Sequence, residues 1–362
     1  MKIIYDYQVF REKVSGASRV ICEIANILRR SDDVKILAPF SCNLYYKEIF
    51  GVYHPFLSTH YFKGRDRIVN YFSQKLVFDA IKKNQVDIFH PTWETLYYYN
   101  KADVGVGGKI PLIMTFHDMI PENYFENNPR LPGRKILADI STRIVCVSHN
   151  TKKEFLEYYD YIDPDKVSVV YHGISQTITN YKPNIWGEYL LYVGTRNSYK
   201  NFSFMVEALA PLLLKYPELK LVCTGQGFRK EEMSLFTQLK IAKQLVNVGF
   251  VDDNTLYSLY RHAKAFIFPS LYEGFGIPIL EAFVNSCPAC LANASCFPEI
   301  GGDSAIYFDP RNKESILDIV TKVVEDDEFA NILRKKGSER VKNFTWEKSA
   351  MAMRNCYEKA LK

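Results

Sequence analysis

Two glutamates, Glu273 and Glu281, lie eight residues apart in the run EGFGIPILE, around a Gly-aromatic-Gly turn and a proline. Pro278 suits the first position of a helix, because the N–H that proline lacks is not needed there. We therefore expect a helix to begin at Pro278, with Glu281 in its first turn and Glu273 in the preceding loop. Both carboxylates are then expected to face one pocket, where they can accept hydrogen bonds from sugar or ribose hydroxyls.

The residues between the two glutamates indicate an anionic ligand. Glycines let the backbone come close to a ligand, and the exposed N–H groups of a helix start favour negative charge. The expected donors are the backbone amides of Gly274, Phe275, Gly276 and Ile277. This run therefore predicts a phosphate-bearing, hydroxyl-rich ligand. A glycine-containing loop with ordinary surface glutamates is the alternative.

A second segment, YLLYVGTRNSYKNF (189–202), has the pattern of a strand, a loop and a helix. Its apolar run ends at Gly194, and Arg196 and Lys200 follow in the loop. An arginine and a lysine at the carboxyl end of a parallel strand can neutralise a leaving diphosphate without a metal ion. Taken alone they could be surface cations; together with EGFGIPILE they predict a phosphate clamp.

The first half of the chain offers two further candidates. Gly16 follows Ser15 at the start of a helical pattern, so Ser15 can cap that helix while Gly16 presents N–H groups to a cleft between domains. His117 directly follows the apolar run 110–116, at the sheet edge where open α/β sheets bind ligands. A histidine satisfied in the core is the alternative for His117. We treat His172 only as a possible cleft residue.

Short apolar runs alternate with helical patterns along the whole chain, and this happens twice. The pattern predicts an α/β protein with two Rossmann-like, doubly wound domains. Strand-like runs fall at 2–6, 34–38, 86–90, 110–116, 143–148 and 166–172, and then at 188–194, 219–225, 245–250, 263–270, 288–292 and 304–309. The polar segment 175–187 is the expected linker, and residues 345–361 read as a final helix.

Length and composition are those of a folded protein with two domains. The chain has 362 residues, of which 47% are hydrophobic and 24% charged, which excludes a disordered chain. Its formal net charge of +5 favours anionic substrates or an anionic membrane surface. Since no long basic stripe occurs, we expect no nucleic-acid partner.

Eight cysteines are scattered along the chain, several of them in apolar runs, and are expected to be buried, reduced thiols. Cys287 and Cys290 form a CxxC, but no second ligand pair accompanies them, so we expect strand packing and no metal site. Neither a signal-peptide pattern nor an apolar run long enough for a membrane span is found. The protein is expected in the cytoplasm, where it could contact the inner face of the membrane peripherally.

Three other motifs are discounted. Neither half carries G-x-G-x-x-G after its first strand, which argues against a dinucleotide oxidoreductase. TGQG (224–227) is interpreted as a βα turn. Asp163 and Asp165 resemble a metal-binding D-x-D, but they flank a proline in a polar connector, where such residues are usual in turns.

The chain resembles the retaining GT-B glycosyltransferases with the E-x7-E signature, family 4, over nearly its whole length. The matching pieces are 15–19, TFHDMIPE (115–122), 145–155, 170–174, VGTRNSYKN (193–201), 224–227, FPSLYEGFGIPILEAF (268–283), 297–302 and 344–350. The resemblance implies an acceptor-binding domain, 1–177, completed by the C-terminal helix 345–362, and a nucleotide-sugar domain, 178–344.

The resemblance also implies roles and a mechanism. His117 would contact the donor sugar, Glu273 the hydroxyls of that sugar, and Glu281 the ribose, while Arg196 and Lys200 hold the diphosphate. The reaction would be a front-face substitution with no metal or other cofactor required. HDMIPE is similar to bacterial mannosyltransferases of surface-polysaccharide assembly, which makes GDP-mannose the first expectation for the donor and a UDP-hexose the second.

The acceptor is expected to be a saccharide in lipid-linked form. Aromatic and basic residues gather at 43–56, 63–67 and 96–101, and some of them are expected to contact an anionic membrane. Two alternatives from other classes stay open. A non-catalytic nucleotide-sugar binder would show no turnover, whereas a GT-B epimerase would release nucleotide without an acceptor and a phosphorylase would carry a pyridoxal Schiff base.

Overall fold

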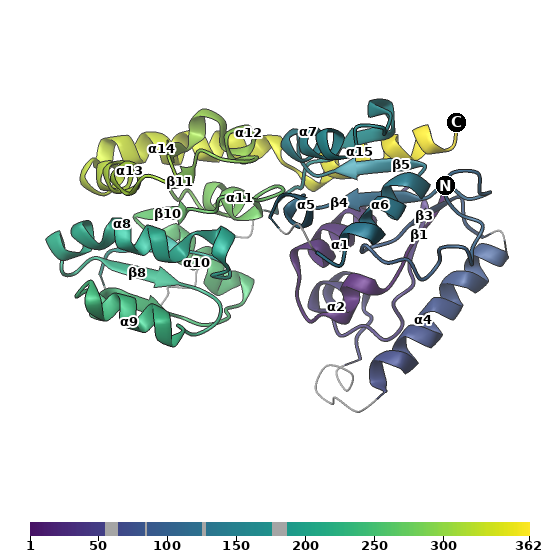
Figure 1. The fold of residues 1–362 in the computed structure, drawn as a ribbon, viewed down its shortest axis with the longest axis horizontal. Coiled ribbons are helices and arrows are strands. Elements are labelled where there is room, and N and C mark those ends of the chain that lie inside the picture. Colours follow the sequence, from purple (N-terminus) through teal and green to yellow (C-terminus); the bar gives the residue numbers. More distant parts are fainter. Residues whose placement is uncertain (55–63, 84, 125–127, 176–186) are drawn as a thin grey trace. The chain divides into compact units, whose positions relative to one another are not determined.

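A computed structural model describes residues 1–54, 64–83, 85–124, 128–175 and 187–362 (Figure 1). The chain divides into two compact units. Unit 1 consists of residues 1–173 together with 346–362, and unit 2 of residues 174–345. Most of the expected linker, residues 176–186, lies outside the described residues, as do residues 55, 56 and 63 of the aromatic and basic tracts.

Unit 1 is built on parallel strands in the order β2-β1-β3 and β4-β5-β6. A parallel bridge between Phe89 and Leu112 joins the two groups, so β3 lies next to β4. The strands are β1 (Lys2–Tyr5), β2 (Asp33–Ile36), β3 (Ile88–His90), β4 (Ile113–Phe116), β5 (Arg143–Cys146) and β6 (Val167–Val169). Because β2 and β3 pair with opposite sides of β1, the strand order reverses between β1 and β3.

Helices cover this sheet (Figure 1). They are α1 (Gly16–Leu28), α2 (Leu44–Phe50), α4 (Arg65–Lys82), α5 (Ile120–Tyr124), α6 (Leu131–Ile140), α7 (His149–Tyr158) and α15 (Trp346–Ala360). Helix α1 begins where the sequence predicts, since the side chain of Ser15 accepts a hydrogen bond from the Ser18 N–H at 3.2 Å.

The last helix of the chain belongs to the first sheet. Helix α15 packs on α1 and β5, as the yellow ribbon beside β5 in Figure 1 shows. The buried hydroxyl of Tyr357 lies 2.7 Å from the Tyr5 hydroxyl and 2.8 Å from Nδ1 of His90. These contacts attach the end of the chain to the carboxyl ends of β1 and β3.

Unit 2 holds a six-stranded sheet in the order β12-β11-β10-β7-β8-β9, with every pairing parallel. The strands are β7 (Tyr189–Tyr192), β8 (Lys220–Cys223), β9 (Leu245–Asn247), β10 (Ala265–Phe268), β11 (Ala289–Ala292) and β12 (Ile306–Phe308). The order reverses between β7 and β10, and ligands of open α/β sheets bind at such a point.

The helices of unit 2 connect these strands on the two faces of the sheet (Figure 1). They are α8 (Phe202–Lys215), α9 (Lys230–Gln238), α10 (Asp253–His262), α11 (Ile277–Val284), α12 (Phe297–Gly301), α13 (Lys313–Glu325) and α14 (Asp327–Arg340). No helix among the described residues is both long enough and apolar enough to cross a membrane.

The expected α/β class with parallel sheets is confirmed, and strands occur in each predicted apolar run. They are shorter than the runs, and the remaining residues of each run lie in the flanking loops. All eight cysteines are buried and free, as expected, and Cys290 lies within β11. TGQG lies in the loop between β8 and α9, and the Asp163 side chain accepts a hydrogen bond from the Asp165 N–H in a short 3-10 helix.

One local prediction is wrong by a residue. Helix α11 begins at Ile277, and Pro278 occupies its second position. Gly276 precedes it with a φ of 88°, a left-handed conformation that glycine adopts without strain. Glu281 is therefore the fifth helical residue and lies beyond the first turn. Proline is still tolerated, since none of the first N–H groups has a partner within the helix.

Candidate functional site

The predicted residues of unit 2 gather after β7 and β10, on both sides of the point where the strand order reverses. Gly194 follows β7 with a φ of 133°, and a Cβ built there would meet no atom within 4 Å. Its backbone is thus open to a ligand. The neighbouring loop after β8 is close, since a Cβ on Gly225 would lie 3.3 Å from the Gly194 carbonyl oxygen.

Lys200 and Glu273 form an ion pair that joins these two loops. The Lys200 Nζ contacts Oε1 of Glu273, and each side chain is only 15% exposed. The backbone is tied as well, because the Leu271 N–H donates to the Tyr199 carbonyl at 2.8 Å. The Ser295 hydroxyl donates to the Glu273 carbonyl at 2.5 Å. A mostly buried cation and carboxylate are therefore held together at the sheet edge.

Arg196 is buried, and most of its hydrogen-bonding groups have partners within the protein, which the sequence did not predict. Its Nε donates to the Glu232 carboxylate at 3.1 Å, and its Nη2 donates to the carbonyls of Gln226 and Gly227 at 2.5 and 2.7 Å. The guanidinium lies over the ring of Phe228 at 5.2 Å. Only Nη1 has no hydrogen-bond partner among the described residues, and it is buried.

Glu232 was not identified from the sequence, although it balances the charge of Arg196. It belongs to the first turn of α9, where its carboxylate accepts the Arg229 N–H at 2.7 Å and the Arg229 guanidinium at 2.9 Å. Burial raises the pKa of Glu232, but these hydrogen bonds and both arginines outweigh it, so the pKa is lowered overall. The only local signal was the acidic first turn of a helix, which is common.

The run EGFGIPILE is largely buried. The Phe275 side chain is buried against Phe344, with 6.2 Å between ring centroids, so its backbone alone can meet a ligand. Glu281 is buried and its Oε2 accepts a hydrogen bond from the Tyr260 hydroxyl at 3.1 Å. The two glutamates therefore have different partners, Lys200 and Tyr260. Ser270, also after β10, is buried with no partner for its hydroxyl among the described residues.

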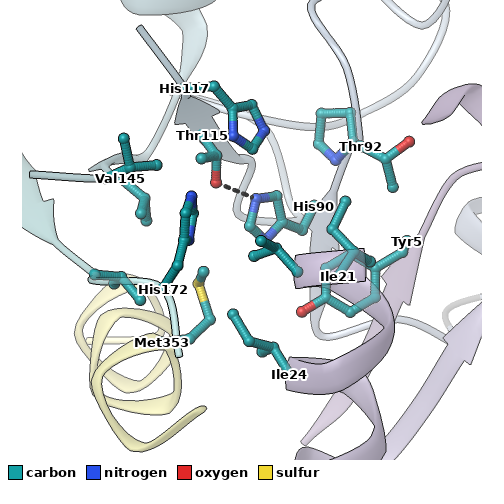
Figure 2. A pocket seen from close by; sticks show the side chains of 14 residues that line it. Tyr5, Ile21, Ile24, His90, Thr92, Thr115, His117, Val145, His172 and Met353 are labelled. Carbon is teal, nitrogen blue, oxygen red and sulfur yellow. Dashed lines mark hydrogen bonds between the residues drawn. The ribbon is translucent and has the colours of Figure 1, made fainter. Parts of the chain in front are cut away.

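In unit 1, His117 follows β4 and lines a pocket with two other histidines. Figure 2 shows the rings of His90, His117 and His172 around this pocket, with Ile21, Ile24 and Met353 on its apolar side. The His90 Nε2 lies 2.9 Å from the Thr115 hydroxyl, and the centroids of the His117 and His172 rings are 6.3 Å apart. Gly16, the first residue of α1, belongs to the same unit.

Burial keeps these histidines neutral. Burial, and to a smaller extent the neighbouring His117, lowers the pKa of His90 and His172 to about 3. For His117, burial and the charge of Arg134 lower the pKa to about 4, against the raising effect of Asp118. A neutral imidazole can both donate and accept a hydrogen bond, which suits a hydroxyl ligand better than an anion.

Acid should therefore destabilise unit 1, and this should begin at a pH well above the pKa that the histidines have in the folded state. All three are neutral in both states at pH 7. As the pH falls below about 6.5, the histidines of the unfolded chain bind protons, whereas those of the folded chain stay unprotonated until about pH 4. The free energy of unfolding should fall with a slope approaching ~4 kcal/mol per pH unit, which corresponds to three protons.

Denaturant unfolding at pH 7, 6 and 5 measures this slope. The His90→Asn variant should have a shallower slope than the wild type, whereas His54→Asn, at an exposed position, should keep the wild-type slope. An unfolding free energy that stays constant from pH 7 to 5 would contradict the buried, neutral state of these rings.

Among the described residues, no group of three or more His, Cys, Asp or Glu side chains is arranged to hold a metal ion.

Comparison with known proteins assigns a family to each half of the chain. Residues 14–177 match the model of Glycosyltransferase Family 4, and residues 182–340 match that of Glycosyl transferases group 1. The chain is 24% identical to O-antigen chain mannosyltransferase B of Escherichia coli, over 99% of this chain and all of the relative.

Two further comparisons concern a lipid-linked substrate and the fold. An N-acetylgalactosaminyltransferase of Campylobacter jejuni, whose name includes diphospho-undecaprenol, is 27% identical over 51% of each chain. The structure of Alr3699/HepE from Anabaena, in complex with UDP and glucose, superposes with a TM-score of 0.74 at 16% identity, covering 98% of both chains. At that identity the superposition establishes the fold.

Proposed function

Since this chain is a GT-B glycosyltransferase of the family 4 type, we propose that it moves a hexose from a nucleoside-diphosphate sugar to a saccharide acceptor with retention of configuration. The observation that supports this most directly is the Lys200–Glu273 pair between the loops after β7 and β10. It offers a cation for a diphosphate and a carboxylate for sugar hydroxyls at the edge where parallel sheets bind ligands. Unit 2 would bind the donor and unit 1 the acceptor.

The proposed reaction is a front-face substitution. The bond between the anomeric carbon and the diphosphate oxygen breaks, and the acceptor oxygen bonds to the anomeric carbon on the same face. The acceptor proton passes to the departing phosphate oxygen. Lys200 and Arg196 stabilise the charge of the leaving diphosphate, and neutral His117 hydrogen-bonds the transferred sugar.

We propose GDP-mannose as the donor and a UDP-hexose as the second candidate. The similarity to an O-antigen mannosyltransferase supports the first, and the UDP complex of the Anabaena protein supports the second. A thermal-shift panel of GDP-, UDP- and ADP-sugars tests this, since a ligand at a hundred times its Kd adds about 2.7 kcal/mol to stability. Proton NMR of the product then reads the anomeric configuration, and an inverted product would overturn the retaining mechanism.

The acceptor is proposed to be lipid-linked, with the enzyme in the cytoplasm and in contact with the inner membrane face. The exposed face of α4 supports this, and its apolar residues lie outside the three tracts that the sequence suggested. Ile68, Tyr71, Phe72 and Leu76 are each between 43% and 63% exposed. Their spacing places them on one side of the helix, and the exposed cations Arg67, Lys75 and Lys82 accompany them.

The aromatic side chains of the tracts are buried to different degrees. Tyr46 is buried and its hydroxyl donates to the Ile36 carbonyl at 2.9 Å, and Tyr98 is fully buried. Tyr99 remains exposed. The membrane contact is therefore assigned to the exposed face of α4.

Flotation with vesicles containing anionic lipid tests this assignment. Replacing Tyr71 and Leu76 together by serine should lower the vesicle-bound fraction at low salt roughly tenfold or more, because apolar side chains no longer enter the interface. The control is Leu214→Ser, at an exposed leucine of unit 2. If the wild type floats with neither anionic vesicles nor its native membranes, a soluble acceptor replaces the lipid-linked one.

A further inference from the structure

Trp93 lies at the point where the strand order of unit 1 reverses. It follows β3, whose neighbours are β1 and β4. The preceding residue, Thr92, is fixed to the end of β1, since its N–H and its hydroxyl donate to the buried Asp6 carboxylate at 2.8 and 2.5 Å. The corresponding point in unit 2 carries the Lys200–Glu273 pair. Open α/β sheets bind ligands at this position.

The indole of Trp93 is 39% exposed and lies beside His117. The two rings are nearly parallel, at 25°, with 6.2 Å between their centroids. The Arg130 guanidinium lies 5.6 Å from the indole centroid and pairs with the Glu94 carboxylate. The exposed aromatic surface of Trp93 therefore adjoins His117, the predicted sugar-binding histidine, and has hydrogen-bonding groups at its border.

A buried arginine holds this arrangement in place. Arg134, which is almost fully buried, contacts the carboxylate of Glu94 and donates from Nε to Glu122 at 2.5 Å. Its Nη2 also donates to the Asp118 carbonyl at 2.7 Å. The loop after β3, the loop after β4 and helix α6 are thus joined through one side chain. Such support keeps an exposed side chain in one orientation before a ligand arrives.

The charges around Trp93 favour a neutral ligand. Arg130 and Arg134 are balanced by Glu94 and Glu122, so among the described residues no unpaired cation remains here for a phosphate. A pyranose is neutral, its C–H face packs against an aromatic ring, and its hydroxyls accept from a guanidinium or donate to a carboxylate. A nucleoside diphosphate would instead need the cations of unit 2.

We propose that Trp93, with Arg130 and Glu94 at its border, binds a pyranose ring of the saccharide acceptor. This rests on the proposed function. Because the indole is exposed, its removal creates no cavity in the core, and the fold should survive.

Steady-state kinetics and saturation-transfer NMR test the assignment. Trp93→Ala should raise the KM for the acceptor roughly tenfold or more and leave the KM for the donor unchanged. Trp93→Tyr, which keeps an aromatic face, should restore most of the affinity. The matched control is Tyr99→Ala, since Tyr99 is 37% exposed in the same unit. In NMR, methyl α-mannopyranoside and mannobiose should receive saturation from the wild type and the Tyr99 variant, and not from Trp93→Ala.

The outcomes separate this proposal from the proposed function. If the wild type transfers sugar and Trp93→Ala has an unchanged acceptor KM, the subsite is wrong and the function stands. A raised donor KM with an unchanged acceptor KM would assign Trp93 to the donor and overturn the proposal. A lack of saturation transfer from the wild type to either probe would also overturn it. If the wild type neither binds nor consumes any nucleotide sugar, the proposed function itself fails.

Discussion

Replacing Lys200 by alanine is expected to lower the transfer rate by roughly a hundredfold or more, because the leaving diphosphate would lose its preorganised cation. The Lys200 ammonium contacts Glu273 and lies in a mostly buried loop, where charge is poorly screened. Activity should survive excess EDTA, since the protein itself supplies the positive charge. Initial rates with saturating donor, with and without EDTA, measure both effects.

Lys264 provides the matched control for this experiment. Its side chain is 18% exposed and paired with Glu188 and Asp327, but it lies at the amino end of β10, away from the ligand-binding edge. Lys264→Ala should therefore keep the wild-type rate. A Lys200→Ala enzyme near the wild-type rate, together with a strict and restorable need for magnesium or manganese, would show that the charge is stabilised elsewhere.

Arg196→Ala should also slow the reaction by roughly a hundredfold, but its interpretation is less direct. The arginine holds Glu232 and two backbone carbonyls, so its removal leaves a buried carboxylate with fewer partners. Breaking a buried pair in this way costs about 3–5 kcal/mol of stability. Rates of this variant must therefore be compared at temperatures where the folded fraction is known.

Glu281→Ala is expected to weaken donor binding by about 1.5–3 kcal/mol, the range for a hydrogen bond to a charged group, if the carboxylate accepts from the ribose. At 1.4 kcal/mol per tenfold, this is roughly a 10- to 150-fold rise in the Kd of the nucleoside diphosphate. Calorimetric titration with GDP and UDP measures it. Glu273→Ala should instead act on turnover, because its proposed partner is the transferred sugar.

Tyr260 separates the binding role of Glu281 from its structural role. The Tyr260 hydroxyl donates to Glu281, and the loss of that acceptor leaves a buried donor unpaired. Glu281→Gln keeps an acceptor oxygen for Tyr260 and should preserve stability better than Glu281→Ala, while still losing the charge that favours the ribose. Unchanged donor affinity and turnover in both the Glu273 and Glu281 alanine variants would remove these assignments.

Much of the architecture was predictable because it depends on local patterns. Apolar runs of four to eight residues between helical patterns predict buried parallel strands, and all such runs contain one. Ser15 caps α1 because a serine oxygen reaches the N–H three residues later wherever a helix begins. The predicted residues Gly194, Lys200 and Glu273 follow strands, so a parallel sheet must place them at its carboxyl edge.

Tertiary structure alone decided which of these side chains meet. Lys200 pairs with Glu273 because β7 and β10 are neighbours, although 73 residues separate the two side chains in the chain. Arg196 is fixed by Glu232, which α9 brings to it from the next strand connection. A single sequence contains no information on such distant pairs beyond the residue types themselves.

The sequence by itself determined the α/β elements, the order of the loops and the residue types at the sheet edges, because hydrophobic periodicity and turn chemistry act over a few residues. Only the tertiary structure decided that α4 presents an apolar, basic face, and that Tyr46 and Tyr98 are buried whereas Tyr99 is exposed. It alone placed Trp93 beside His117 and made the three histidines neutral. Burial and charge balance depend on what packs against a side chain, and that partner usually comes from a distant part of the chain.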